Sequence, residues 1–475
     1  MFVDRQEELA FLNKLLARRR PTAAQLVLLY GRRRIGKTVL AQHWAVQSGL
    51  PSLYWAAEPE NAGVQRRKLA ARLLGVDVSE APIFESWASL WTTLATQIGD
   101  RPFILMLDEV SYAAEADTAF LASLQHAWDQ RFKHSRAVIL LSGSHVRTME
   151  AMQNAGSPLF GRLTGQWHLQ PLPFSALREF LPGWSAEQRV AVYACFGGIP
   201  AYLEWLDPMQ SLKANLRTVF AKGSPFSAEA EFLLRDEFRE STAYHTVLGA
   251  IGRGAHSLEE ISNSALVAKP HLSSHLARLQ EVHFVERRLP VTVPPQRTRT
   301  SHSGRYHFSD PFLNFYFSFV APAYSQLGYW PEDAMDRAEE QLRAFIGRGA
   351  FERLCWVWLN QASRAGNLPF ELERIGSHWA RGVQVDAVGI NWRQHAILLG
   401  ECKWTADAVG RDVVDDLLTI KTDKTRQALP EGGQHWTVHH YLFTRGPLTP
   451  PARTLAREKH VEVVELKQLA RDLGA

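Results

Sequence analysis

The sequence predicts a multidomain α/β protein whose N-terminal part is a parallel β-sheet covered by helices. Three observations support this fold class. The chain has 475 residues, more than a single hydrophobic core usually supports, so several domains are expected. Short apolar runs alternate with helical patterns up to about residue 173, which is the order of a parallel sheet. A glycine-containing loop joins the first long strand to the helix after it.

This loop has the sequence GRRRIGKT, which matches the spacing GxxxxGK[ST]. An apolar strand precedes it at 26–30 and a helical pattern follows it at 38–44. In such a loop the backbone N–H groups surround nucleotide phosphates, the lysine reaches the β- and γ-phosphates, and the hydroxyl ligates Mg²⁺. The sequence therefore predicts an ATP or GTP site. Its expected residues are Gly31, Arg32, Arg33, Arg34, Ile35, Gly36, Lys37, Thr38 and Val39.

A second part of the same site is predicted at the end of the next buried strand. The apolar run 103–107 is followed by Asp108 and Glu109. We expect Asp108 to hold the Mg²⁺ through water and Glu109 to orient the attacking water, the role that distinguishes ATPases that hydrolyse from those that only bind. An acidic strand end that faces solvent is the alternative interpretation.

Two further residues are candidates for contact with the γ-phosphate. The strand predicted at 137–141 ends in the sequence Ser-Gly-Ser, and its last residue, Ser144, is the expected polar sensor. Arg162 is a candidate cation near the γ-phosphate, although a lone loop arginine is more often solvated.

Composition limits the class of protein and its surroundings. The chain carries 53 Lys and Arg against 49 Asp and Glu, a net charge of +4 that permits nucleic-acid binding without demanding it. Its cysteines, Cys195, Cys355 and Cys402, are far apart and form no CxxC pair, which favours a reducing compartment, the cytoplasm. We expect no secretory signal and no membrane span.

A helical segment is predicted at 174–235, and it contains the sequence GGIPAYL. Together GRRRIGKT, LDE, SGS and GGIPAYL resemble the STAND branch of the AAA+ ATPases of archaea and bacteria, over about the first half of the chain. The resemblance implies ATP as the nucleotide, an ATPase core at 1–173, and a helical lid whose Gly198 and Pro200 lie close to it.

The segment 236–325 has the order of a winged helix-turn-helix: three helices, the third following a proline, and then two short strands. The third helix offers polar positions that would face a DNA groove, and basic residues on it and in the wing would contact phosphates. These residues are His271, Ser273, Ser274, His275 and Arg278 for the groove, and Lys269, Arg297, Arg299 and Arg305 for phosphates. Two alternatives to DNA binding are a metal site at His271 and His275 and a winged helix that serves only in packing or dimerisation.

The C-terminal part, 335–475, has a helix, two apolar strands, a second helix and a further strand. This order resembles the PD-(D/E)XK nucleases. Asp386 on one strand precedes the sequence Glu401-Cys402-Lys403 on the next, and Glu352 falls at the position of the family's helical glutamate.

The chemistry explains why these residue types would come together. We expect Asp386 and Glu401 to share Mg²⁺ with the scissile phosphate, Glu352 and the backbone carbonyl of Cys402 to complete the metal shell, and Lys403 to position the attacking water. A solvated sheet edge is the alternative. Carboxylates that interrupt apolar strands favour the metal site, because a buried carboxylate needs a partner.

The sequence therefore predicts an ATP-hydrolysing switch that controls a Mg²⁺-dependent nuclease. Its expected partner is nucleic acid, with double-stranded DNA favoured. We expect no association with a membrane, and a homo-oligomer is compatible with the sequence. The alternative is a signalling switch or DNA-binding regulator whose C-terminal domain binds without cutting. DNA versus RNA, sequence preference and the triggering signal are left open by the residues.

Overall fold

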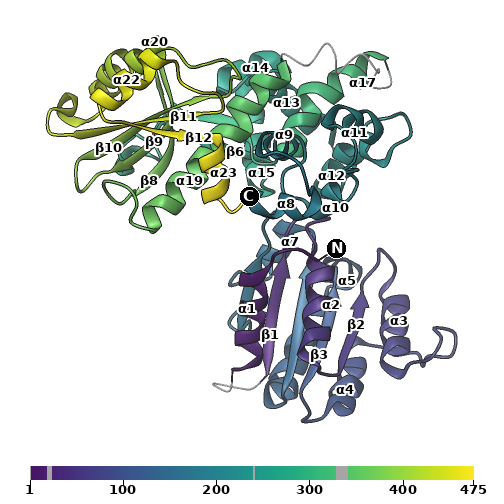
Figure 1. The fold of residues 1–475 in the computed structure, drawn as a ribbon. Coiled ribbons are helices and arrows are strands. Elements are labelled where there is room, and N and C mark those ends of the chain that lie inside the picture. Colours follow the sequence, from purple (N-terminus) through teal and green to yellow (C-terminus); the bar gives the residue numbers. More distant parts are fainter. Residues whose placement is uncertain (1, 19–23, 239–240, 328–340) are drawn as a thin grey trace. The chain divides into compact units, whose positions relative to one another are not determined.

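The computed structural model describes residues 2–18, 24–238, 241–327 and 341–475. These residues form two compact units. The first comprises 1–172 and 199–204, and the second comprises 173–198 and 205–475, so each unit is built from two separate parts of the chain (Figure 1). The domain boundary expected at residue 335 lies outside the described residues.

The first unit has a five-stranded sheet in the order β2-β3-β4-β1-β5. Every neighbouring pair is parallel, which confirms the predicted parallel α/β sheet. Its strands are β1 (Gln25–Tyr30), β2 (Ser52–Ala56), β3 (Phe103–Asp108), β4 (Ala137–Gly143) and β5 (Gly165–His168). All residues of β1, β3 and β4 are buried, as expected of central parallel strands that are covered on both faces.

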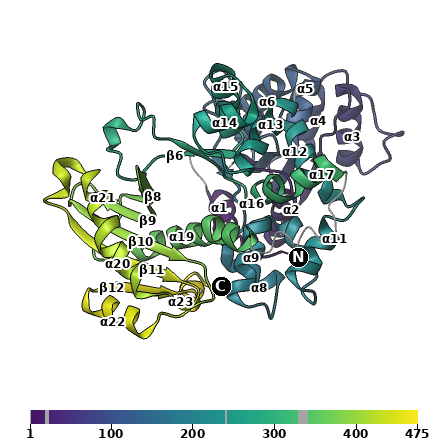
Figure 2. The ribbon, with the colours of Figure 1, turned by 90° about the horizontal axis from the view of Figure 1, so that it is seen from above.

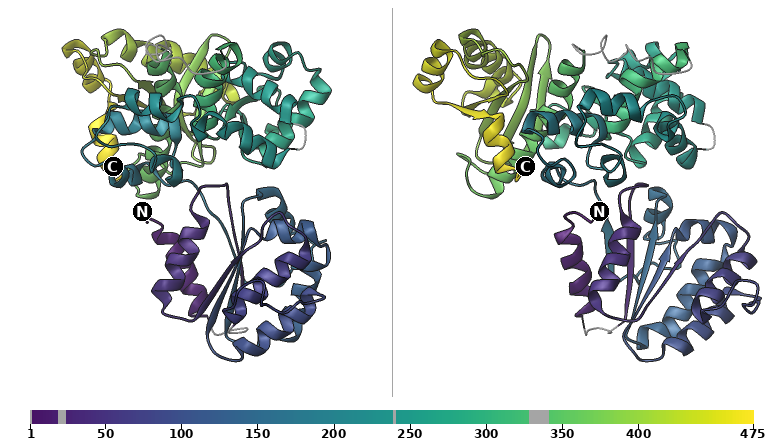
Figure 3. Two further views of the ribbon diagram at one scale, coloured as in Figure 1. Left: turned by 90° about the vertical axis from the view of Figure 1, so that its right-hand side faces the viewer. Right: turned by 45° about the vertical axis from the view of Figure 1, so that its right-hand side comes forward.

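Helices cover both faces of this sheet (Figure 3). The first two helices lie on one face and the later ones on the other. The bounds are α1 (Gln6–Leu16), α2 (Lys37–Ser48), α3 (Ala62–Leu74), α4 (Trp87–Ile98), α5 (Val110–Ala116), α6 (Ala119–Gln130) and α7 (Val146–Ala151). Because parallel strands need a crossover, the loops after the strands all open at one edge of the sheet.

Aromatic side chains of α4 and α6 fill the core beneath this sheet. The ring centroid of Trp87 lies 5.5 Å from that of Trp91 and 4.9 Å from that of Phe120. We expect Trp87→Ala to lower the free energy of unfolding of the first unit by about 3–5 kcal/mol, because the vacated volume is too enclosed to collapse. Urea unfolding followed by circular dichroism measures this. Val46→Ala, at an exposed position of α2, should change it by less than about 0.5 kcal/mol.

The helical segment expected at 174–235 is present. Its longer helices are α9 (Ala186–Phe196), α11 (Leu212–Val219) and α12 (Glu229–Glu237). The short turn α8 (Leu177–Phe180) precedes α9, and the short turn α10 (Pro200–Leu203) lies between α9 and α11. A phenylalanine cluster joins this segment to α16 (Pro311–Phe315): the ring of Phe220 lies 5.6 Å from that of Phe315 and 6.3 Å from that of Phe312. The turn α10 belongs to the first unit and the rest to the second.

Three helices and a two-stranded antiparallel ladder follow in the second unit. They are α13 (Ser241–Gly252), α14 (Leu258–Ala265), α15 (Lys269–Glu281), β6 (Val285–Arg288) and β7 (Arg305–Phe308). A capping box between Ser257 and Glu260 begins α14, and Pro270 stands in the first turn of α15, where its missing N–H costs nothing.

The C-terminal sheet has five strands in the order β12-β11-β10-β9-β8. The strands are β8 (Arg374–Ala380), β9 (Val383–Asn391), β10 (Ala396–Lys403), β11 (Thr437–Thr444) and β12 (Val461–Glu465). Neighbouring strands are antiparallel from β8 to β10 and parallel from β10 to β12. The edge strands β8 and β12 were not among the predicted strands, because exposed, partly polar edge residues lack the continuous apolar run of a central strand.

Helices pack on both faces of this sheet as well (Figure 2). The helix α19 (Glu352–Arg364) contacts β8 and β9, and the ring of Trp358 lies 5.7 Å from that of Phe443 of β11. On the other face lie α20 (Arg411–Asp416), the π-helical turn η7 (Leu417–Lys421), α21 (Thr422–Gln427) and α22 (Pro450–Glu458). The last helix is α23 (Leu466–Asp472).

Candidate functional site

The glycine-containing loop lies between β1 and α2, as the sequence predicts. Gly31 has φ 155° and Gly36 has φ 96°, conformations that side chains rarely adopt. A Cβ at Gly31 would lie 2.6 Å from the carbonyl oxygen of Leu169, so the turn also needs a residue without a side chain. Arg34, with φ 64°, bends the middle of the loop. The loop therefore curls its backbone around a common centre.

Lys37 lies at this centre. Its Nζ donates to the carbonyl oxygens of Gly31 (2.9 Å) and Arg32 (3.2 Å) and to Oγ of Ser144 (2.7 Å). Burial lowers the pKa of Lys37, and the nearby carboxylates of Glu109 and Asp108 oppose that shift. The lysine is thus a buried cation between two carboxylates and the loop backbone.

Asp108 accepts hydrogen bonds from three hydroxyl groups. Thr38 Oγ1 donates to its Oδ2 (2.6 Å), Tyr54 OH donates to the same oxygen (3.0 Å), and Ser142 Oγ donates to its Oδ1 (2.6 Å). Burial, with the charge of Asp108, raises the pKa of Tyr54, so the phenol stays a donor. The contact between Thr38 and Asp108 brings together the two residues that were expected to hold Mg²⁺.

Glu109 faces the same centre from the end of β3. Its carboxylate accepts the backbone N–H of Ser144 (2.9 Å) and the Ser144 hydroxyl. Its φ of 49° is uncommon for a residue with a side chain, and such conformations often occur at functional sites. Lys37, Ser144 and Glu109 therefore form one hydrogen-bonded chain at the edge of the sheet where the strands end.

Three arginines fix the loop in place: Arg32 and Arg33 belong to the loop, and Arg5 precedes α1. Arg32 Nη2 donates to Tyr202 OH (2.9 Å), Arg33 Nη2 donates to Tyr112 OH (2.5 Å), and Arg5 Nη2 donates to the carbonyl oxygen of Ile35 (2.9 Å).

The other members of the predicted set lie in or beside the loop. Ile35 is buried, and Val39, the next residue along α2 after Thr38, is about half exposed. Pro200 Cγ would lie 3.9 Å from a Cβ at Gly36, so Pro200 sits beside the loop as the resemblance implied. Gly198 belongs to the second unit.

Arg162 needs a correction. Its guanidinium forms an ion pair with Asp129 (2.9 Å) and donates to the carbonyl oxygens of Pro158 and Phe160. Asp129 is near the end of α6, and Arg162 precedes β5, so both lie at the edge where strands begin. Because the phosphate loop follows β1, it lies at the opposite edge. The structure does not bring Arg162 to the phosphate loop of its own chain.

Sequence reasoning missed two residues of this site. It gave no role to Tyr54, and it chose Ser144 of the Ser-Gly-Ser sequence but not Ser142. Both bind Asp108 because β2 and β4 flank β3 in the sheet. The usable signal was a hydroxyl side chain on the neighbouring strands at the level of Asp108.

A second group of charged side chains lies on the C-terminal sheet. Glu352 begins α19, Asp386 is on β9, and Glu401 and Lys403 are on β10. Lys403 Nζ donates to Oε1 of Glu401 (2.8 Å), and Lys421 Nζ, from η7, donates to Oε2 (2.5 Å). Lys421 had no predicted role at this site, because its place against β10 depends on how η7 packs.

The carboxylates of this group interact electrostatically. Burial and the charge of Glu401 raise the pKa of Asp386 to about 6, while the backbone N–H of Cys402, which donates to Asp386 Oδ2 (3.1 Å), opposes the rise. Burial and the charge of Asp386 raise the pKa of Glu352 well above its ordinary value. Carboxylate oxygens are ligands of the kind Mg²⁺ prefers, but among the described residues the ligand atoms of Glu352, Asp386 and Glu401 do not converge closely enough to form a ready three-carboxylate site.

The polar positions predicted on α15 lie on its exposed side. Leu272, Leu276 and Leu279 are buried on the opposite side. Exposed residues are Lys269, His271, Ser273, Ser274 and Arg278 on the helix and Arg297 and Arg299 between β6 and β7, whereas His275 is half-buried against Tyr244. Within the part of the chain that the structure describes, no third metal-ligating group joins His271 and His275. Arg305 is half-buried, with its guanidinium 4.9 Å from the ring centroid of Trp379.

Comparisons with known proteins agree with the first site. Residues 2–206 match a family model described as an ATPase domain predominantly from Archaea, and residues 316–423 match one described as archaeal and bacterial proteins of unknown function. An uncharacterized protein of Methanocaldococcus jannaschii, MJECL04, is 32% identical over 418 residues, 87% of this chain and 89% of that protein. The chain belongs to the same family as this archaeal protein. Its first unit is an ATPase domain that binds nucleotide.

Two solved structures are also similar to this chain. The Walker-type ATPase PABY2304 of Pyrococcus abyssi is 19% identical, with a TM-score of 0.48 over 66% of this chain and 96% of that chain. The ORC2 protein of Aeropyrum pernix is 16% identical, with a TM-score of 0.42 over 72% of this chain and 93% of that chain. Among the described residues of this chain, no helix is both long enough and apolar enough to cross a membrane.

Proposed function

We propose that the protein is an ATP-hydrolysing switch that controls a Mg²⁺-dependent nuclease in its C-terminal domain. The observation that carries the nuclease half is that Glu352, Asp386, Glu401 and Lys403 come from three separate elements and interact electrostatically, with Glu352 and Glu401 buried and Asp386 and Lys403 half-buried. Repulsion between these carboxylates costs free energy, and the ammonium groups of Lys403 and Lys421 offset it only at Glu401, so a further cation would stabilise the group.

At the first site each residue has a chemical task. Lys37 and the loop N–H groups bind the phosphates, and Thr38 and Asp108 hold the metal that neutralises them. Glu109 orients and polarises the attacking water, and Ser144, hydrogen-bonded to both Lys37 and Glu109, links the phosphate site to the water site. This link supports a sensor role for Ser144.

At the second site Mg²⁺, when bound, supplies a positive charge between the carboxylates and the scissile phosphate. Asp386, Glu401, Glu352 and the Cys402 carbonyl are its proposed ligands. Lys403 would position the attacking water and stabilise the developing negative charge. Incubation of the full chain with double-stranded and single-stranded DNA and RNA, with and without ATP and Mg²⁺, tests the activity directly.

The alternative function, a regulator that binds nucleic acid without cutting, is favoured by one observation. Both oxygens of Glu401 already accept an ammonium group, one from Lys403 and one from Lys421. These ion pairs compete with a metal for the carboxylate. If the wild-type chain never cleaves any of the substrates in Mg²⁺ or Mn²⁺, this alternative replaces the nuclease.

The segment α13 to β7 supports a proposal of a winged helix that contacts nucleic acid. Its exposed basic residues Arg297 and Arg299 lie between β6 and β7, where a wing would contact phosphates. This part of the function is separate from cleavage and has its own test.

If Arg297 and Arg299 contact phosphates, the double variant Arg297→Ala/Arg299→Ala should bind DNA more weakly. The slope of log affinity against log salt should fall by up to about 2, because each lost phosphate contact releases about 0.9 fewer counterions. Fluorescence anisotropy at several salt concentrations measures it. Lys14→Ala/Arg72→Ala, which removes two exposed charges from the first unit, is the control. An unchanged slope in the Arg297/Arg299 variant would move DNA contact away from this wing.

A further inference from the structure

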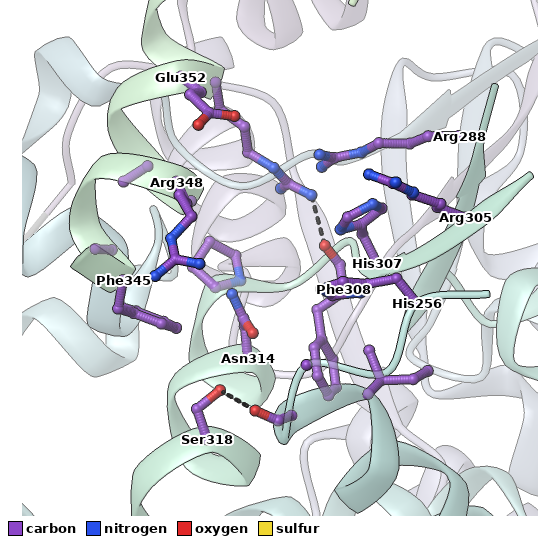
Figure 4. A pocket seen from close by; sticks show the side chains of 18 of the residues that line it. His256, Arg288, Arg305, His307, Phe308, Asn314, Ser318, Phe345, Arg348 and Glu352 are labelled. Carbon is purple, nitrogen blue, oxygen red and sulfur yellow. Dashed lines mark hydrogen bonds between the residues drawn. The ribbon is translucent and has the colours of Figure 1, made fainter. Parts of the chain in front are cut away.

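A cavity of about 540 Å³ lies within the second unit (Figure 4). Its wall comes from the end of α13, the ladder β6-β7, the beginning of α19 and the strands β8 and β9. This volume is in the range of small-molecule and cofactor sites, which run from about 300 to 1,000 Å³. Among the residues given a role above, Glu352 of the proposed metal site and Arg305, expected to contact phosphates from the wing, form part of its wall.

The wall of this cavity is strongly cationic. The arginines that line it are Arg253, Arg288, Arg305, Arg348 and Arg353, and Glu352 is the one carboxylate among the lining residues. Figure 4 shows Arg288 and Arg305 directed toward His307, with Arg348 on the opposite side of the cavity near Asn314. Clustered guanidinium groups repel one another, so this arrangement favours an anionic ligand.

Protein groups offset only part of this charge. Arg288 and Arg353 share one oxygen of Glu286, at 2.5 and 2.7 Å. Arg305 lies over the ring of Trp379, and among the described residues neither it nor Arg348 forms a salt bridge with a carboxylate. Burial and the charge of Arg353 lower the pKa of Arg288, and the carboxylates of Glu286 and Glu352 oppose that shift.

The cavity also offers neutral and aromatic surface. The rings of His256 and His307 are stacked, with centroids 4.3 Å apart. Burial and the charge of Arg288 lower the pKa of His307, so its ring is neutral at physiological pH and adds no further charge. Trp379 and Phe345 add aromatic faces to the wall. A cationic wall beside aromatic faces fits a ligand that combines phosphate with a flat ring.

We propose that this cavity binds a phosphate-bearing ligand of nucleotide size, either the terminal nucleotide of a nucleic-acid strand or a free nucleotide. Arg305 and Arg348 would bind the phosphate, because their guanidinium groups have no salt-bridge partner among the described carboxylates. The site is distinct from the phosphate loop of the first unit, and its binding does not depend on cleavage at Asp386 and Glu401.

The test measures binding in EDTA, where a Mg²⁺-dependent nuclease cannot act. Isothermal titration uses the full chain and three probes: a 5′-phosphorylated DNA hexanucleotide, the same hexanucleotide with a 5′-hydroxyl, and a nucleoside 5′-monophosphate. Arg305→Ala and Arg348→Ala should each weaken binding of the phosphorylated probes by about tenfold or more, as loss of a charge-assisted contact does.

Arg287→Ala is the matched control. Arg287 follows Glu286 on the same strand as Arg288, its side chain points to the opposite face, and its Nη2 donates to the carbonyl oxygen of Ser301 (2.5 Å) outside the cavity. This variant should bind as the wild type does.

The probes distinguish the two sources of the ligand. Tighter binding of the phosphorylated hexanucleotide than of the monophosphate assigns the cavity to a strand end, and equal affinity assigns it to a free nucleotide. Unchanged affinity in both Arg305→Ala and Arg348→Ala overturns the proposal, as does failure of the wild-type chain to bind any probe. Either failure leaves the proposed nuclease activity to be judged by its own cleavage assay.

Discussion

Glu109→Gln should give a protein that binds ATP with wild-type affinity and hydrolyses it about 10²–10⁴ times more slowly, the usual contribution of a positioned general base. The amide keeps the shape of the side chain and can still accept a hydrogen bond from the backbone N–H of Ser144. It loses the negative charge that polarises the attacking water. Phosphate release measures turnover, and titration with a fluorescent ATP analogue measures affinity.

Lys37→Ala should have a different effect from Glu109→Gln, because it should lose ATP binding rather than only hydrolysis. The lysine supplies the buried positive charge at the centre of the phosphate loop, so its removal should weaken ATP binding by at least about a hundredfold. Lys14→Ala, at an exposed position of α1, should leave both binding and turnover unchanged. A Glu109→Gln protein that hydrolyses ATP at the wild-type rate would show that another group orients the water.

The first site could be predicted because most of its residues are neighbours in sequence. The loop, its glycines and Lys37 lie within one short segment, and Asp108 and Glu109 end a strand that the apolar pattern indicates. The contribution of Tyr54 could not be predicted, because it depends on β2 lying next to β3, and strand order is a property of the folded sheet.

Arg162 was misjudged for a related physical reason. Its role depended on which edge of the sheet it occupies, and the short strand β5 (Gly165–His168) that follows it was not among the predicted strands. A residue just before a parallel strand lies at the edge away from the phosphate loop. The ion pair with Asp129 then accounts for its guanidinium.

The C-terminal site was partly accessible from the sequence. Asp386 and the Glu401-Cys402-Lys403 run interrupt apolar strands, and adjacent antiparallel strands bring them together. Lys421 was not accessible, since its contact with Glu401 requires η7 to pack against β10. The cavity lined by arginines could not be predicted from the sequence at all, because its wall is assembled from residues between 193 and 384 in separate elements.

Asp386→Ala should abolish nucleic-acid cleavage while leaving ATP hydrolysis unchanged, because the two sites lie in different units. Removing one carboxylate takes away the charge that would hold Mg²⁺ against the phosphate. Lys403→Ala should reduce the cleavage rate by about 10²–10³, the cost of losing one group that stabilises negative charge in the transition state. Gel assays of labelled DNA and RNA measure cleavage, and phosphate release from ATP measures the other activity.

Two variants of the same domain separate chemistry from folding. Asp415→Ala removes an exposed carboxylate of α20, and Lys459→Ala removes an exposed lysine that precedes β12. Both should cleave as the wild type does. Lys421→Ala is informative in a different way: it releases one oxygen of Glu401 from an ion pair. If that ion pair restrains the metal site, Lys421→Ala should need less Mg²⁺ for half-maximal cleavage, whereas a purely structural ion pair would leave the Mg²⁺ requirement unchanged and lower only the unfolding midpoint.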